Sequence, residues 1–187
     1  MKKTIGILLA GGLSRRFGSP KAFAKIDGDY FYEKAHRALE SVCDDVVIVA
    51  REELLPLFPA SLDVITDLPA IAGKGPLAGI CTAMKLRPAE DYLLLPCDMP
   101  FIGPPEALAL KRLANPEVSV TAVQTANERI PLFSSWSGNF AAELEQAIFN
   151  GNLSVFDFLA ALETDWIDAA RIHPDEGKFR NINRNSE

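Results

Sequence analysis

The strongest constraint on the fold of this chain is a set of three short apolar runs. They cover residues 5–9, 46–49 and 93–95, and Gly, Asp or Pro stands close to each of them. Continuous apolar runs of this length suit strands that are buried on both faces, as in parallel sheets covered by helices. The runs therefore predict the central strands of a parallel sheet.

Helical patterns separate these runs. Proline suits the first turn of a helix because it has no N–H to leave unpaired, and Pro76 opens one of the patterns. Strands that alternate with helices require right-handed crossovers, so we expect an α/β sandwich. The apolar positions that share one helical face are Phe31, Ala35, Ala38, Leu39 and Val42 in the first pattern, and Leu77, Ile80, Cys81 and Met84 in the second. Further helices are expected over 106–113, 140–149 and 155–162, and further strands over 64–66, 118–123 and 130–134, the last weakened by Pro131.

Length and composition fit one domain, residues 1–187, with 48% hydrophobic residues to build its core. Nineteen Lys and Arg against 25 Asp and Glu give a net charge of −6, so general binding of nucleic acid is not expected. No apolar run approaches the roughly 18 residues that span a bilayer. The first run stops at Gly11-Gly12, too early for a secretory signal. We therefore expect a cytoplasmic protein with no membrane or nucleic-acid partner.

Cysteine and histidine usage excludes several kinds of site. Cys43, Cys81 and Cys97 are odd in number and lack CxxC or Cys/His spacing, which argues against a disulfide framework and a structural zinc site. They are interpreted as buried thiols in a reducing compartment. His36 and His173 are far apart, and no Ser or Cys pairs with them in the pattern. A hydrolytic triad therefore finds no support.

The loop at residues 9–21, Leu-Ala-Gly-Gly-Leu-Ser-Arg-Arg-Phe-Gly-Ser-Pro-Lys, follows the first run directly. Ligands of open α/β sheets bind beyond the carboxyl ends of the strands, where glycines let backbone N–H groups approach phosphates. Between residues 14 and 26 stand Arg15, Arg16, Lys21 and Lys25 and no acid, against the negative sign of the whole chain. A solvated surface turn would share the glycines, but the position and the charge reversal favour a polyphosphate site.

A second signal is Asp98, which stands just beyond the third apolar run, in the sequence Pro96-Cys97-Asp98-Met99-Pro100. A carboxylate is costly to bury unless it is paired or binds a metal, so an acid at this end of a strand is a candidate Mg²⁺ ligand. Asp is also common in turns before proline. The phosphate-binding loop nearby favours the metal-ligand interpretation.

Together these residues resemble a known family. The glycine-rich loop, the segment Gly75-Pro76-Leu77-Ala78-Gly79 and the Asp98 segment are similar to the three motifs of the molybdenum cofactor guanylyltransferases, and the tail at 181–183, Asn-Ile-Asn, resembles that family's closing motif. The resemblance covers nearly the whole chain. It implies a Rossmann-like three-layer sandwich with a mostly parallel sheet, of the nucleotide-diphospho-sugar transferase type.

The resemblance also implies roles for individual residues. Leu9, Ala10, Gly11 and Gly12 would hold the guanine nucleotide through backbone groups, Arg16 and Lys21 would meet its triphosphate, Asp67 would contact the nucleotide, and Asp98 would hold Mg²⁺. Arg16, Lys21 and Asp98 would form the catalytic set. Asn181 and Asn183 would lie on the pterin side, although Asn most often satisfies backbone groups in turns. The segment from Gly75 to Gly79 can also serve close packing of a helix on the sheet.

The implied reaction transfers GMP from GTP to the phosphate of molybdopterin, releases pyrophosphate and depends on Mg²⁺. The implied partners are these two substrates, with molybdoenzyme maturation proteins as a further contact. Three alternatives stay open: a molybdopterin cytidylyltransferase, a sugar-phosphate nucleotidyltransferase, and a non-catalytic GTP-binding module. Related cytidylyltransferases usually have Ala-Gly where this chain has Gly11-Gly12, which favours GTP. The family often has an acid before its lysine, where Pro20 stands, and an Asn where Val49 stands.

Overall fold

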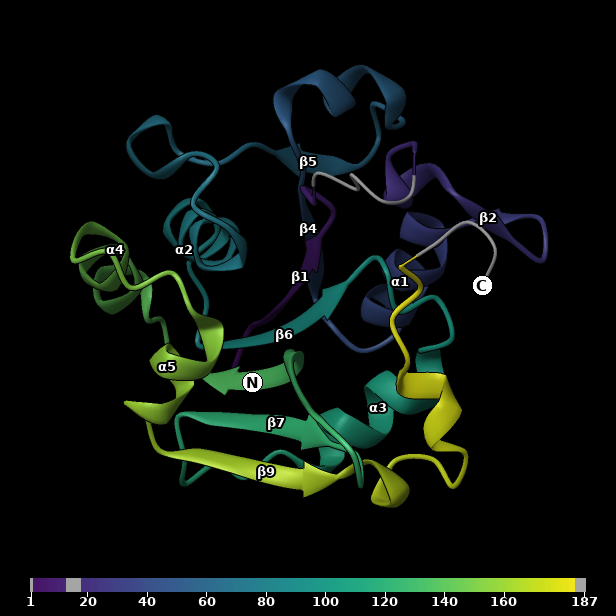
Figure 1. The fold of residues 1–187 in the computed structure, drawn as a ribbon, viewed down its shortest axis with the longest axis vertical. Helices are drawn as coiled ribbons and strands as arrows, with labels where there is room; N and C mark the ends of the chain where they lie inside the picture. The colour runs from purple at the N-terminus through teal and green to yellow at the C-terminus, as the bar shows by residue number, and fades with distance from the viewer. Residues whose placement is uncertain (1, 13–17, 184–187) are drawn as a thin grey trace.

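The computed structural model describes residues 2–12 and 18–183. Within them, seven strands form one sheet in the order β5-β4-β1-β6-β8-β7-β9 (Figure 1). The pairs β5–β4, β4–β1, β1–β6 and β7–β9 are parallel, and β8 runs antiparallel to both of its neighbours. The strands are β1 (Thr4–Leu9), β4 (Asp45–Val49), β5 (Asp63–Ile65), β6 (Asp91–Pro96), β7 (Val120–Gln124), β8 (Arg129–Ser137) and β9 (Thr164–Asp168). The predicted mostly parallel sheet is confirmed.

Helices cover both faces of this sheet, which gives three layers (Figure 1). One face carries α1 (Phe31–Glu40) and α3 (Pro104–Leu113), and the other carries α2 (Pro76–Leu86), α4 (Ala141–Phe149) and α5 (Val155–Ala160). A small hairpin of β2 (Lys25–Ile26) and β3 (Asp29–Tyr30) precedes α1. Short 3₁₀ helices complete the chain: η1 (Lys21–Phe23), η2 (Glu52–Leu57), η3 (Pro69–Ile71), η4 (Ala169–Arg171) and η5 (Glu176–Phe179).

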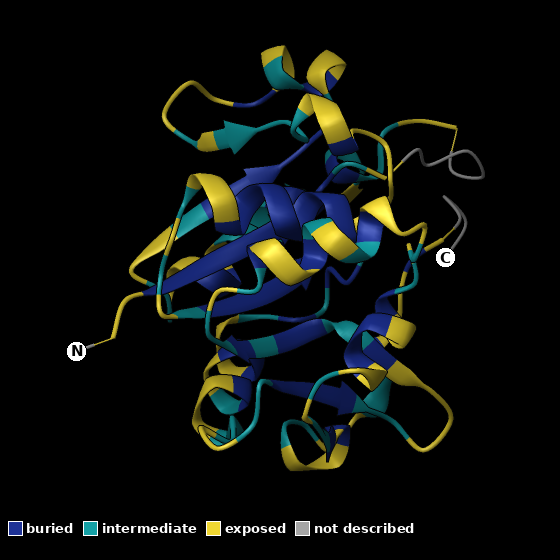
Figure 2. Ribbon diagram, turned by 90° about the vertical axis from the view of Figure 1, so that its left-hand side faces the viewer, coloured by how far each residue is buried: buried dark blue, intermediate teal, exposed yellow. Residues whose placement is uncertain are grey.

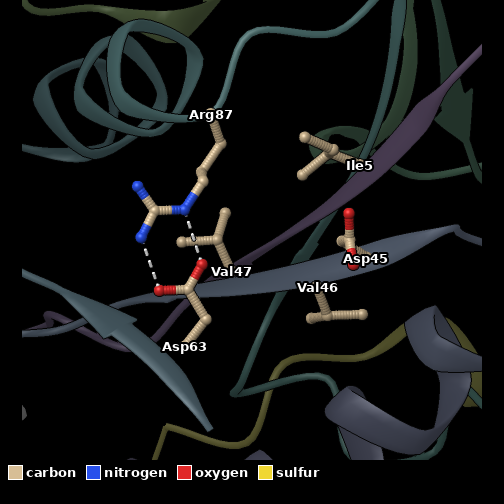
Figure 3. Close-up of a pocket in the computed structure, with 6 residues that line it drawn as sticks. All are labelled: Ile5, Asp45, Val46, Val47, Asp63 and Arg87. Atoms are coloured by element: carbon tan, nitrogen blue, oxygen red, sulfur yellow. Dashed lines mark hydrogen bonds and ion pairs between the residues drawn. The ribbon is translucent and has the colours of Figure 1, made fainter.

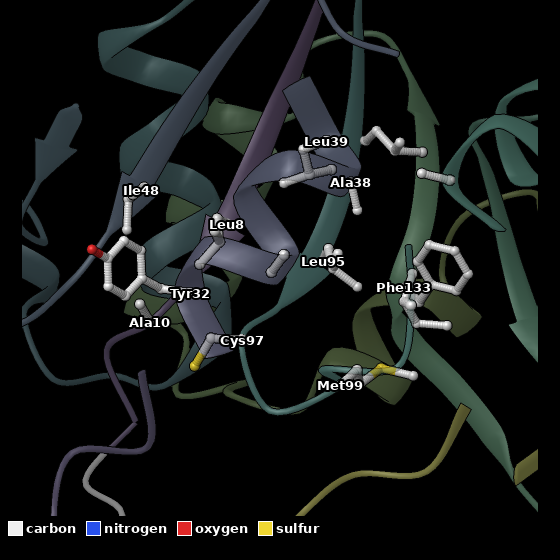
Figure 4. Packing of buried hydrophobic residues seen from close by; sticks show 14 of the residues in the cluster. Leu8, Ala10, Tyr32, Ala38, Leu39, Ile48, Leu95, Cys97, Met99 and Phe133 are labelled. Carbon is white, nitrogen blue, oxygen red and sulfur yellow. The ribbon is translucent and has the colours of Figure 1, made fainter. Parts of the chain in front are cut away.

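Two apolar clusters hold the layers together, one on each face of the sheet. Successive residues of a strand point to opposite faces, so Ile7 packs in the cluster with α2 while Leu8 packs in the cluster with α1. Figure 4 shows Leu8, Leu39 and Leu95 in this second cluster. The central strands are buried and the outer turns of the helices are exposed (Figure 2). This two-sided burial explains why the strands read as continuous apolar runs.

One glycine fixes how closely α1 approaches the sheet. A Cβ built on Gly6, in β1, would lie 2.9 Å from the Cβ of Leu39 and 3.2 Å from Cγ2 of Val46. The Cβ of Leu39 is bonded directly to the backbone, so a change of side-chain rotamer cannot move it aside. The close packing of α1 on β1 therefore depends on the missing side chain at residue 6.

The strand around Pro131 is longer and more central than the sequence predicts. Proline is usually confined to strand edges or bulges because it donates no ladder hydrogen bond. The pairing of β7 with β8 shifts register between Ala122, opposite Ser134, and Val123, opposite Ile130. Pro131 lies inside this irregularity, and its carbonyl accepts a hydrogen bond from the Ser134 hydroxyl at 2.9 Å. The bulge thus accommodates proline in an inner strand.

None of the helices in the described part of the chain is long and apolar enough to cross a membrane. The sheet edge at β9 was not predicted from the sequence. Its residues Thr164, Asp165 and Trp166 are half-buried and Asp168 is exposed, so the strand carries no continuous apolar run.

Candidate functional site

The candidate site lies at the carboxyl edge of the parallel strands. From β1 the chain first adds β4 and β5 on one side, and it then places β6 on the other side of β1. The strand order therefore reverses between β1 and β6, which is the place where open α/β sheets bind ligands. The glycine-rich loop follows β1 at this point, and Asp98 follows β6 beside it.

Backbone hydrogen bonds fix the start of the glycine-rich loop. The Leu9 carbonyl accepts from the Cys97 N–H at 3.0 Å, and the Ala10 N–H donates to the Val49 carbonyl at 2.8 Å. Gly11 lies over the end of β4, where an added Cβ would be 3.8 Å from the Val49 carbonyl oxygen. A Cβ on Gly12 would meet no atom of the described residues within 4 Å. The described residues therefore leave the Gly12 backbone uncovered on this side, and Arg15 and Arg16 fall outside the described residues.

Lys21 stands at the centre of a three-residue polar cluster. Its ammonium lies 3.2 Å from Oδ2 of Asp98 and donates to Oδ1 of Asn183 at 2.7 Å. The side chains of Lys21 and Asp98 are 15% and 26% exposed, so the ion pair is shielded yet reachable from solvent. The backbone N–H of Ile182 donates to the Asp98 carbonyl at 2.9 Å and holds the tail in place. The structure thus brings together two predicted site residues and one of the two tail asparagines.

Asp67 lies apart from this cluster, beyond the carboxyl end of β5. Burial raises the pKa of its carboxyl group, and a hydrogen bond of 3.1 Å from the Gly73 N–H acts in the opposite direction. Strands are spaced by about 4.8 Å, so the three steps from β5 to β6 separate Asp67 from Asp98 by roughly 14 Å along the edge. The two carboxylates therefore flank the glycine-rich loop and do not form a pair.

Gly79 supports the packing interpretation of the segment from Gly75 to Gly79. A Cβ on Gly79, in α2, would lie 3.1 Å from Cδ2 of Leu9, 3.4 Å from Cγ1 of Val49 and 3.8 Å from Oδ1 of Asp67. Gly75 has a φ of 81°, in the left-handed region that favours glycine. This segment therefore lets α2 approach the ends of β1 and β4 beside Asp67.

The donors at Asp98 suit a cation that arrives with its own ligands. Among the described residues, no group of three or more His, Cys, Asp or Glu side chains could hold a metal ion. Mg²⁺ commonly keeps several waters and is held by one or two carboxylates together with substrate phosphates. A single reachable carboxylate close to the glycine-rich loop fits that pattern. It does not fit a preformed protein cage.

Sequence reasoning missed the ion pair that anchors the tail. Glu106 is only 1% exposed, accepts from the Gly103 N–H at 2.8 Å and pairs with the Lys178 ammonium at 2.8 Å. Glu at the third position of a helix, as in α3, is a capping signal visible in the sequence, whereas the contact with Lys178 is not. Phe179 and Ile182, which follow Lys178, are buried. The C-terminal segment (176–183) is therefore held at two places, by the ion pair of Lys178 with Glu106 and by the hydrogen bond from Ile182 to Asp98.

A hollow lies at the opposite edge of the sheet, at the amino ends of β1, β4 and β5. It measures about 250 Å³, and Ile5, Asp45 and Asp63 are among its lining residues (Figure 3). The Arg87 guanidinium closes one side through two hydrogen bonds of 2.7 Å to the Asp63 carboxylate. This hollow lacks the glycine loop and lies at the edge of the sheet where α/β folds do not bind substrates.

Comparisons with known proteins agree with this geometry. Residues 6–165 match the family model of the MobA-like NTP transferase domain. A probable molybdenum cofactor guanylyltransferase of Geobacillus sp. (strain WCH70) is 35% identical over 100% of this chain and 97% of its own length. One with the same description from Bacillus subtilis (strain 168) is 34% identical over 97% of this chain and 90% of its own length.

Solved structures share the fold. Molybdopterin-guanine dinucleotide biosynthesis protein A of Archaeoglobus fulgidus is 23% identical, with a TM-score of 0.79 over 96% of this chain and 92% of its own. A nucleotidyl transferase of Methanothermobacter is 15% identical, with a TM-score of 0.73 over 98% of this chain and 93% of its own. Identities this low establish the architecture alone. The family model and the full-length relatives go further, and they show that this chain is an enzyme of the MobA-like NTP transferase family.

Proposed function

We propose that this protein transfers GMP from GTP to the phosphate of molybdopterin and releases pyrophosphate. The observation that carries the proposal is the cluster of Lys21, Asp98 and Asn183 beside the glycine-rich loop, at the point where the strand order reverses. The full-length relatives named guanylyltransferases support the choice of nucleotide and acceptor. We further propose that residues 1–187 work as one domain.

In this reaction the nucleophile belongs to the acceptor. An oxygen of the acceptor phosphate attacks the α-phosphorus of GTP, and a new P–O bond forms. The bond from that phosphorus to the oxygen bridging to the β-phosphorus breaks, and pyrophosphate leaves with the bonding electron pair. Catalysis then depends on positioning and on stabilising the charge that develops on pyrophosphate.

The site residues divide this work. The backbone from Leu9 to Gly12 would hold the nucleotide, Arg16 and Lys21 would neutralise its phosphates, and Asp67 would contact it on the side of β5. Asn183 accepts from Lys21 and would orient that ammonium toward the acceptor side. Asn181 would lie on the pterin side with it. A triphosphate bound over the carboxyl ends of β1 and β6 would draw the Lys21 ammonium away from Asp98. The Asp98 carboxylate would then be available to a cation.

Asp98 would hold Mg²⁺ together with phosphate oxygens of GTP, because one reachable carboxylate suits a cation that is otherwise ligated by substrate and water. When bound, Mg²⁺ would supply charge neutralisation for the triphosphate and for the departing pyrophosphate. Cys97, next to Asp98, is buried, and burial raises the pKa of its thiol to about 12. The proposed chemistry assigns no role to this thiol.

We also propose that the enzyme acts in the cytoplasm and passes its product to molybdoenzyme maturation proteins. All three cysteines are free thiols, and Cys81 and Cys97 are buried while Cys43 is half-buried. Free thiols are typical of a reducing compartment. Binding of such a maturation protein can be measured with the purified enzyme before and after it has turned over.

The decisive experiment is pyrophosphate release by the purified protein with Mg²⁺ and molybdopterin, tested separately with ATP, CTP, GTP and UTP. We expect release with GTP and only in the presence of the acceptor. Lys21→Ala should abolish most of this release, while the control Lys85→Ala, which removes a cation paired with Glu145 on α4, should not. Faster release with CTP would favour the cytidylyltransferase, release only with a sugar phosphate as acceptor would favour that class, and GTP binding without release would favour a non-catalytic module.

A further inference from the structure

A hollow of about 350 Å³ lies between α1, the loop from β6 to α3, and the C-terminal segment. Three of its lining residues are cations, Lys34 and Arg37 from α1 and Lys178 from η5. None of the described residues that line it is acidic. We call this hollow the cation pocket. Its size is within the range of about 300–1,000 Å³ of small-molecule sites.

Each of these cations forms an ion pair with an acid that is not itself a lining residue of the pocket. Lys34 pairs with Asp27 at 3.5 Å, Arg37 pairs with Asp29, and Lys178 pairs with Glu106 at 2.8 Å. Asp27 is 77% exposed, so solvent weakens its hold on Lys34. An ammonium has three N–H donors and a guanidinium has five, more than these pairs use. Each cation can therefore keep its acid and still donate to an anion in the pocket.

The other described lining residues of the pocket are apolar, apart from Gly103. Phe101, Ile102 and Pro104 line it, and the Arg180 guanidinium lies 4.0 Å from the centroid of the Phe101 ring. Phe101 also packs against the cluster of Phe31 and Ile182. This cluster lies between the cation pocket and the Lys21–Asp98 pair, since Ile182 donates to the Asp98 carbonyl. The pocket is thus next to the reaction centre but behind the C-terminal segment.

We propose that the cation pocket binds a phosphate-bearing small molecule at a position separate from the nucleotide loop. Among the described residues, three cations and no acid line the pocket, in contrast to the net charge of −6 of the whole chain. Phosphate is a dianion near neutral pH and takes charge-assisted hydrogen bonds from both Arg and Lys. The apolar lining residues suit the organic part of a phosphate ester. The inference depends on these residues and not on guanylyl transfer.

The test is a titration of the full chain followed by amide NMR, with three probes: inorganic phosphate, pyrophosphate and phenyl phosphate. The backbone N–H groups of Ile102 and Gly103 report on the cation pocket, and those of Ala10 and Ala22 report on the nucleotide loop. We expect saturable shifts at Ile102 and Gly103. Tighter binding of phenyl phosphate would assign the pocket to an organic phosphate, and tighter binding of inorganic phosphate or pyrophosphate would assign it to the free anion.

A double variant and a matched control decide the outcome. Lys34→Gln with Arg37→Gln removes two lining cations whose ion pairs are partly exposed, so the fold should persist. Binding at Ile102 and Gly103 should weaken at least about tenfold, because each charge-assisted contact is worth that much. Lys85→Gln, which removes a similarly exposed cation on α2, should leave binding unchanged. Shifts confined to Ala10 and Ala22, non-saturating shifts, or equal weakening in the control would overturn the proposal.

Discussion

Glu106 provides the sharpest test of how the C-terminal segment is held. The carboxylate is buried in α3, caps that helix through the Gly103 N–H and pairs with Lys178. Replacing Glu106 by Gln keeps the shape and one acceptor oxygen but removes the charge. Replacing it by Ala removes both hydrogen bonds. We expect both variants to fold less stably than the wild type, with Ala the worse of the two.

The expected magnitude follows from these contacts. A hydrogen bond to a charged group contributes about 1.5–3 kcal/mol, and breaking a buried pair costs about 3–5 kcal/mol. Lys178 is 35% exposed and can turn to water, so the Ala variant should lose near the lower bound, about 3 kcal/mol. In a chain of this size that corresponds to a fall in Tm of roughly 6–12 °C. The Gln variant should lose about 1–2 kcal/mol because its amide oxygen can still accept from Gly103.

The pH dependence has a definite sign. Burial alone would raise the pKa of Glu106, but the hydrogen bonds from Lys178 and Gly103 and the charge of Lys178 together lower it below its ordinary value of 4.5. A carboxyl group with a lowered pKa in the folded state stabilises the protein above the unfolded pKa. That stability is lost as the pH falls from about 4.5 through the folded-state pKa. The difference in stability between wild type and Glu106→Gln should shrink over this range.

The assay is urea unfolding at neutral and acid pH, together with pyrophosphate release. Glu145→Gln is the matched control, because Glu145 also pairs with a lysine but is 31% exposed, and it should change stability by less than about 0.5 kcal/mol. The Glu106 variants should also lose turnover at a temperature where they remain folded, since the segment that Lys178 anchors carries Asn183 to Lys21. Equal stability of Glu106→Gln and Glu145→Gln would refute this reasoning.

Four further predictions concern the site and the sheet. Asp98→Asn should keep the fold, because the amide is nearly isosteric, and lower turnover about 10²-fold or more; near-normal turnover at saturating Mg²⁺ would make Asp98 a turn residue only. Lys21→Ala should weaken GTP binding more than GMP binding in calorimetry, by about 1.5–3 kcal/mol, and equal losses would place the ammonium away from the outer phosphates. Gly12→Ala should lower turnover with GTP more than with CTP, because a purine edge read by the backbone needs close approach; unchanged selectivity among the four NTPs would contradict this. Gly6→Ala should reduce the free energy of unfolding by about 1–3 kcal/mol in urea, because its Cβ would meet that of Leu39 at 2.9 Å; wild-type stability would show that α1 can shift at no cost.

Much of the fold could be predicted from local patterns. Residues 5–9 and 46–49 gave strands because both faces of the sheet are covered, and the helix over 31–40 begins where its apolar spacing begins. The expected helix over 106–113 begins two residues earlier, at Pro104, because Gly103 and Glu106 form its cap. β9 escaped prediction because an edge strand with half-buried residues has no continuous apolar run.

The candidate site was predictable only in part. Lys21 and Asp98 each follow from a signal within about ten residues, and their pairing confirms that the two loops meet. Asp67 was placed by resemblance, and in the structure two strands, β4 and β1, lie between the strand before Asp67 and the strand before Asp98. Its contact with the nucleotide remains a prediction. The cation pocket could not be found from the sequence, because Lys178 lies more than a hundred residues from Lys34 and Arg37, which share α1.

The sequence by itself determined most of the strands and helices, and that a glycine-rich loop with a local excess of basic residues follows the first strand. These properties depend on the spacing of apolar residues and on glycines within one loop, which are local. Only the tertiary structure decided that Asn183 reaches Lys21 across 162 residues, and that buried Glu106 holds Lys178. Such contacts form only because the C-terminal segment folds back over the edge of the sheet. The conformational entropy lost in ordering this segment is offset by the burial of Phe179 and Ile182 and by the buried ion pair. A polar residue in a tail has no local signal for its partner, because its neighbours in space are set by packing elsewhere.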